Sequence, residues 1–142
     1  MKARMLATLG VMMGVLTSRA MGQTHIAQAN PVPPISVLIA DLTKGTAPQT
    51  RNAAAYQLAH MGPKAAPAVP ALIEALKDPA ASVRYPAAIA LREIGPAAKA
   101  AIPALKKVAE EDPNDEVAAE AKQALRHIDP NALPKDDKAD KD

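Results

Sequence analysis

Residues 62–72 read GPKAAPAVPAL, and residues 95–105 read GPAAKAAIPAL, so one phrase occurs twice at an offset of 33. The same offset relates Arg51 to Arg84 and Leu58 to Leu91. A period in the thirties that is rich in helix formers and punctuated by Gly-Pro predicts stacked pairs of helices, because one such pair cannot bury its apolar face alone. The sequence therefore predicts an all-α fold of repeated helical hairpins.

Outward from this phrase the chain divides into three repeats. Repeat three matches repeat two at an offset of 34, as Val83 to Val117 and Leu91 to Leu125. Apolar spacing and Gly or Pro breaks predict two helices in each repeat. Their expected ranges are 35–44 and 51–61, then 70–77 and 83–94, then 102–111 and 116–128.

Several residues near the helix starts have predicted local roles. Thr50 and Ser82 are expected to cap the second helices of repeats one and two. Pro70 is expected at the first position of its helix, where proline is best tolerated. Pro86 conflicts with helical geometry at Tyr85, so the start of that helix is expected to slip toward Tyr85.

The N-terminal residues have the pattern of a secretory signal peptide, which we assign to residues 1–22. Lys2 and Arg4 precede an uncharged apolar run, and small residues around Ala20 and Gly22 offer cleavage sites. The run is shorter than the roughly 20 residues of a membrane span. The chain is therefore expected to be secreted or periplasmic, with no stable membrane insertion after cleavage.

The rest of the chain then divides by composition. Residues 23–34 form a Pro-rich leader, residues 35–130 carry the repeats, and residues 131–142 form a charged tail expected to be disordered. Loss of the signal peptide lowers the count of Lys and Arg from 17 to 14, against 15 Asp and Glu. A mature chain near charge −1 does not support nucleic-acid binding.

The residues quoted above resemble the HEAT-repeat family, especially the HEAT-like type named after phycobilisome lyases. The similarity covers about residues 35–130 and implies a short right-handed α–α superhelix, a solenoid of about three hairpins. In that family an Asp of the turn and an Arg of the second helix commonly form a ladder between neighbouring repeats. Repeat two has both, as Asp78 and Arg84, whereas repeat one has only Arg51, and repeat three has Asp112 with Ala118 in the Arg position. The ladder is therefore expected to be broken.

The resemblance also implies that the second helices line a concave recognition face. With Leu91 at the centre of the buried stripe, a rotation of 100° per residue predicts which side chains point away from the core. Both tyrosines of the chain are among them, and Tyr is favoured at binding surfaces. We call these nine positions the second-helix face: Asn52, Tyr56, His60, Tyr85, Ile89, Glu93, Ala119, Gln123 and His127.

The sequence predicts a protein that is not an enzyme and needs no cofactor or metal. It contains no cysteine, which excludes disulfides, thiolate metal sites and Cys nucleophiles. His60 and His127 occupy matching positions two repeats apart, on the order of 20 Å if helices pack 8–10 Å apart, so one ion cannot reach both. The acidic cluster around Asp112 lacks the ligand alternation of a calcium loop, and no Gly-rich phosphate loop is present.

Three functions remain open at this point. The leading hypothesis is a small exported adaptor that binds an unknown protein or peptide across the second-helix face. The alternative is a lyase-like or chaperone-like accessory that holds a chromophore or cofactor, which the family name alone suggests. The third is a structural module that stacks with another copy through an exposed end.

Overall fold

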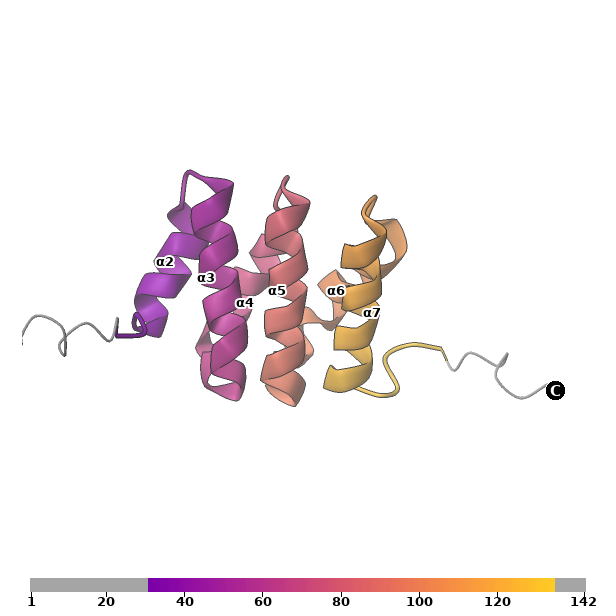
Figure 1. Cartoon of the computed structure of the whole chain (residues 1–142). Helices are drawn as coiled ribbons and strands as arrows, with labels where there is room; N and C mark the ends of the chain where they lie inside the picture. Colours follow the sequence, from indigo (N-terminus) through magenta and orange to yellow (C-terminus); the bar gives the residue numbers. More distant parts are fainter. Residues whose placement is uncertain (1–30, 135–142) are drawn as a thin grey trace, which may run out of the picture. The chain divides into compact units, whose positions relative to one another are not determined.

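A computed structural model describes residues 31–134, and the predicted signal peptide, most of the leader and most of the tail lie outside this range. The described residues form an all-α solenoid of three hairpins, as predicted, without strands. Helices α3, α5 and α7 lie side by side in one row, with α4 and α6 behind them and α2 at the end of the array (Figure 1). The elements are α2 (Ile35–Lys44), α3 (Pro48–Met61), η1 (Gly62–Ala68), α4 (Val69–Ala75), α5 (Ala81–Ile94), η2 (Gly95–Ala101), α6 (Ile102–Glu111) and α7 (Asp115–Ile128).

The repeated Gly-Pro phrase forms the connection from one repeat to the next. Gly62 and Gly95 end α3 and α5 with φ angles of 55° and 74°, a region that side chains disfavour. Each glycine opens a 3₁₀ segment, η1 or η2, that leads to the next first helix. Pro70 is the second residue of α4, one position later than predicted, and it still lies in the first turn, where its missing N–H does no harm.

The predicted starts of α3 and α5 are wrong. Helix α3 begins at Pro48 and α5 at Ala81, and neither Thr50 nor Ser82 caps them, since the N-cap residues are alanines without a side-chain hydrogen bond. The start of α5 does not slip toward Tyr85 either, and Pro86 is its sixth residue. Only at α7 does a side chain cap a described helix, with Asn114 Oδ1 accepting from the Val117 amide at 3.0 Å.

The core is a row of leucines separated by alanines. Each helix contributes a leucine that is almost fully buried, and most of the other buried hydrophobic residues are alanines. Small side chains let the helix axes approach closely, which substitutes for the missing Phe and Trp. The leucines are Leu38, Leu58, Leu72, Leu91, Leu105 and Leu125.

Two arginine–aspartate pairs join the three repeats. Arg51 Nε donates to Asp78 Oδ2 at 2.6 Å and its Nη2 donates to Oδ1 at 3.1 Å. Arg84 forms the same bidentate pair with Asp112, at 2.8 and 3.0 Å. In both pairs a second-helix arginine binds the turn of the next repeat. We call these pairs rungs.

The prediction of a broken ladder is therefore wrong. It looked for both partners within one repeat, whereas each rung takes its arginine from one repeat and its aspartate from the next. Three repeats have two interfaces, and both carry a rung. Each arginine also holds its own turn, because Nη1 of Arg51 donates to the Gly45 carbonyl and Nη1 of Arg84 donates to the Asp78 carbonyl, both at 2.8 Å.

The rungs favour ionised aspartates. Burial opposes ionisation of Asp78 and Asp112, but hydrogen bonds from the arginines and from the amides of Ala80 and Asn114 outweigh it and lower the pKa of both carboxyls. Each aspartate therefore stabilises the fold in its charged form.

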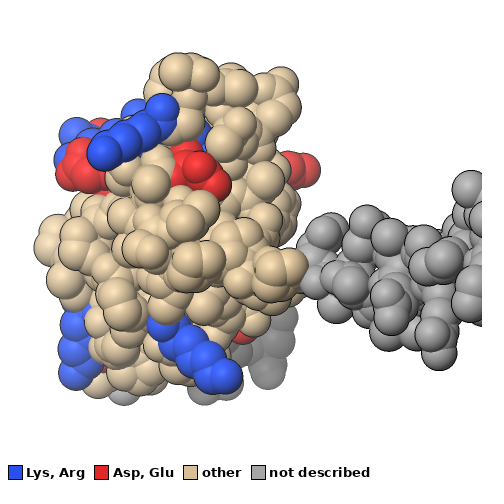
Figure 2. Space-filling model, turned by 90° about the vertical axis from the view of Figure 1, so that its left-hand side faces the viewer, with Lys and Arg blue, Asp and Glu red and all other residues tan. Residues whose placement is uncertain are grey.

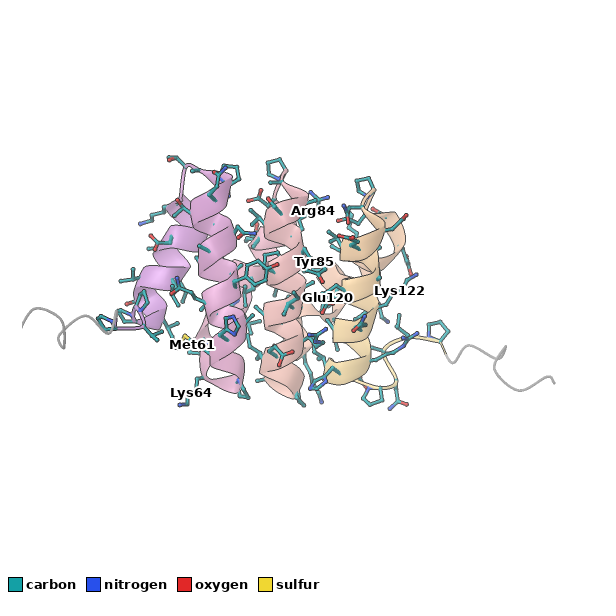
Figure 3. All side chains as sticks on the ribbon, in the orientation of Figure 1. Met61, Lys64, Arg84, Tyr85, Glu120 and Lys122 are labelled. Atoms are coloured by element: carbon teal, nitrogen blue, oxygen red, sulfur yellow. The ribbon has the colours of Figure 1, made fainter. Side chains whose placement is uncertain are left out.

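The two ends of the array differ. At the α2 end, charged side chains gather near the two edges and leave an uncharged expanse between them (Figure 2), and Val37 of α2 is 44% exposed. At the other end, Ala132 and Leu133 pack against the core, and Lys122 lies on the outer side of α7 (Figure 3).

Removal of one rung should measurably destabilise the solenoid. We expect Asp112→Ala to lower the free energy of unfolding by about 2 kcal/mol, because it leaves the Arg84 guanidinium without its charged acceptor. The matched control is Glu110→Ala, an exposed carboxylate on α6, with an expected change within about 0.5 kcal/mol. Urea unfolding followed by circular dichroism measures both, and equal losses would contradict a special role for the rung.

The rungs should also set the acid sensitivity of the fold. Because the pKa of each rung aspartate is lowered below the ordinary 3.8, its stabilisation is present above that value and is lost as pH falls through the folded-state pKa. The melting temperature should therefore fall more steeply between pH 4 and pH 2 in the wild type than in an Asp78→Asn, Asp112→Asn double variant. Parallel curves for the two proteins would show that the rungs do not govern acid unfolding.

Candidate functional site

All nine positions of the second-helix face lie on α3, α5 or α7, and none of them is buried. Tyr56 is 38% exposed and is one of the few large hydrophobic side chains exposed to this degree in the described residues. Tyr85 and Ile89 are half-buried and pack against the core, so core packing holds their exposed parts in place. The binding role assigned to these residues from the sequence stays a prediction.

Two hollows flank Tyr56 on this face. One, of about 400 Å³, lies between α3 and α5. The other, of about 200 Å³, lies toward the start of α7 and is lined by both tyrosines. Each lining includes one carboxylate, Glu93 in the first and Glu116 in the second, and neither includes a lysine or arginine.

Asn52 has a structural role that the sequence analysis missed. Its Nδ2 donates to the Ser82 carbonyl of α5 at 2.5 Å. In a regular helix the Ser82 carbonyl would accept a hydrogen bond from the amide four residues later. That residue is Pro86, which has no N–H. Asn52 therefore supplies, from the neighbouring repeat, the hydrogen bond that Pro86 cannot give.

The second interface carries a further charged cluster. Arg92 contacts Glu120 of α7 and the adjacent Glu93, and donates to Gln123 at 3.3 Å. Glu120 is only 5% exposed and lies between α5 and α7 (Figure 3). Burial raises the pKa of Glu120; the charge of Arg92 opposes this shift, and that of Glu93 adds to it. At the offset of 34, Glu120 corresponds in sequence to Pro86, so the comparison of repeats did not single out Glu120.

The two histidines of the described residues, His60 and His127, do not converge. The side chain of His127 lies beside Gly95, where a methyl group would approach its Cδ2 to 3.7 Å, whereas His60 lines the hollow between α3 and α5. Within residues 31–134, no group of three or more His, Asp or Glu residues is arranged to hold a metal ion. Over the same residues, no helix has the length and hydropathy needed to cross a membrane.

Another pair of hollows lies beside the rungs. One of about 470 Å³ extends from Leu76 to Val108 between repeats two and three, and one of about 440 Å³ occupies the matching place between repeats one and two. Their charged linings include the rung residues Asp78 and Arg84. Asp78 pairs with Arg51 and Arg84 pairs with Asp112 across the interfaces. The linings also include the exposed charged residues Glu74, Lys77, Lys107 and Glu111.

Comparison with known proteins identifies the family. A family model described as HEAT repeats matches residues 35–126. The chain therefore belongs to the HEAT-repeat family, whose members are generally non-enzymatic and commonly serve as scaffolds for protein interaction. The match concerns HEAT repeats in general, and the finer assignment to the phycobilisome lyase type stays a prediction. No curated protein matches the chain.

The structural role of Asn52 has a direct test. We expect Asn52→Ala to destabilise the fold by about 1 kcal/mol, because it leaves the Ser82 carbonyl without a protein donor. Combined with Pro86→Ala, which restores an amide at that position, the same change should cost less. Thermal unfolding of the two single variants and the double variant decides the matter, and a full, additive loss in the double variant would contradict the compensation.

Proposed function

We propose that this chain is an exported, non-catalytic HEAT-repeat adaptor that binds a segment of another protein across the second-helix face. The family supports a scaffold, and the pattern at the N-terminus supports export to a secreted or periplasmic location. The observation that carries the proposal is the placement of Tyr56 and Tyr85 on adjacent helices, where both line one open hollow and Tyr56 also lines a second.

A rigid base favours this kind of recognition. The rungs fix the spacing of α3, α5 and α7, and Tyr85 is half-buried and packs against the core, so binding requires little ordering of this part of the protein. A tyrosine adds a large contact area and a polar tip at low entropic cost. An extended or helical segment laid across the three helices would contact both hollows.

The two other functions stay predictions. Storage of a chromophore or cofactor calls for a deep apolar cleft, and the hollows of the second-helix face are open and modest in size, about 400 and 200 Å³. Self-stacking has one observation in its favour, the uncharged expanse at the α2 end (Figure 2). Light scattering across a range of concentrations tests it.

The adaptor proposal is tested by capture of partners with the mature chain and with a Tyr56→Ala, Tyr85→Ala variant. Because each truncation removes an aromatic contact worth about 1–2 kcal/mol, we expect at least a tenfold loss of the captured protein at unchanged helix content. A Val37→Ala variant at the α2 end is the matched control and should capture as the wild type does. Equal recovery by wild type and the double variant would remove the second-helix face as the binding surface.

A further inference from the structure

The hollow between α3 and α5 is lined by Ala59, one of several positions at which the second helix of repeat one differs from that of repeat two. The offset of 33 relates Ala59 to Arg92. At the interface between repeats two and three, Arg92 crosses to α7 and contacts Glu120 and Gln123. At the interface between repeats one and two, Ala59 is 7% exposed and has no side chain that can cross. The space that the guanidinium fills at one interface is left open at the other.

The lining of this hollow combines apolar surface with one carboxylate. Ala59 and Ile89 form aliphatic surface, Tyr56 supplies an aromatic ring, and the exposed residues Glu93 and His60 complete the lining. Methylene groups pack on such a surface while a charged head reaches the rim, as the side chains of lysine and arginine do on apolar protein surfaces. An ammonium or guanidinium group is also attracted to the face of a tyrosine ring.

The local charge favours a cation. Arg92 contacts both Glu93 and Glu120, so two carboxylates share its guanidinium. Both contacts of Arg92 with Glu93 are to the same oxygen, Oε1. The negative charge of Glu93 also acts on Glu120, whose ionisation it disfavours.

We propose that the hollow between α3 and α5 binds a lysine or arginine side chain of the partner segment, with its methylenes on Tyr56 and Ile89 and its charged head at Glu93. The inference rests on the proposed function and specifies the chemistry of the partner: a segment that presents a basic side chain.

The probe is a random dodecapeptide library displayed on phage and selected against the folded chain. We expect the enriched peptides to share a lysine or arginine. Glu93→Gln should weaken their binding about tenfold, because it removes the charge at the rim without changing the shape of the hollow. Ala59→Arg, which gives repeat one the residue of repeat two, should weaken binding at least as much by filling the hollow. Replacement of the shared basic residue of the peptide by glutamine should have the same effect.

The control for general charge attraction is Glu110→Gln, which removes an exposed carboxylate on α6 and should leave affinity unchanged. If Ala59→Arg fails to fold by circular dichroism, Glu93→Gln and the altered peptide decide the question. Peptides that lose affinity for the Tyr56→Ala, Tyr85→Ala variant but lack a basic residue, or bind Glu93→Gln normally, would overturn this inference and leave the adaptor proposal standing. Peptides insensitive to the tyrosines, or no enriched peptide at all, would contradict both.

Discussion

The bidentate contact between a second-helix arginine and the turn aspartate of the next repeat fixes the geometry of this protein. Helices rich in alanine bury little apolar area, and a stripe of leucines separated by alanines has few features that prevent one helix from sliding on another. A planar guanidinium that meets a carboxylate through two hydrogen bonds, and its own turn through a third, permits only one register. Because the same contact occurs at both interfaces, α3, α5 and α7 are held in corresponding positions.

This fixed register gives meaning to the differences between repeats. When equivalent positions lie side by side, a single substitution changes one interface and leaves the other intact. Arg92 closes the interface between α5 and α7, and Ala59 leaves its counterpart open. Asn52 shows the same logic in a structural role, because it supplies to α5 the hydrogen bond that Pro86 withholds. The repeats thus provide the scaffold, and the departures from the repeat provide whatever specificity the surface has.

The sequence predicted the fold well and the interfaces poorly, for physical reasons. The Gly-Pro phrase and the apolar spacing determined the helical hairpins, and the bounds of α2 and α6 agree with the prediction because each begins and ends at strong local signals. Helix starts were misplaced at Thr50 and Ser82, since their turns are held by the arginine rungs instead of by side-chain caps. The rungs themselves were missed because a contact between repeats cannot be read within one repeat. The same limit hid Glu120, whose partner Arg92 lies 28 residues away on another helix.

The central claim is that the rungs couple the repeats, and a double-mutant cycle on one of them tests it most directly. The cycle compares the unfolding free energies of the wild type, Arg84→Ala, Asp112→Ala and the variant with both changes, measured in urea at neutral pH. The account predicts a coupling free energy of at least about 1 kcal/mol between the two side chains. A coupling near zero, with the two single losses simply adding, would show that the repeats are held together by apolar packing alone and would contradict the account.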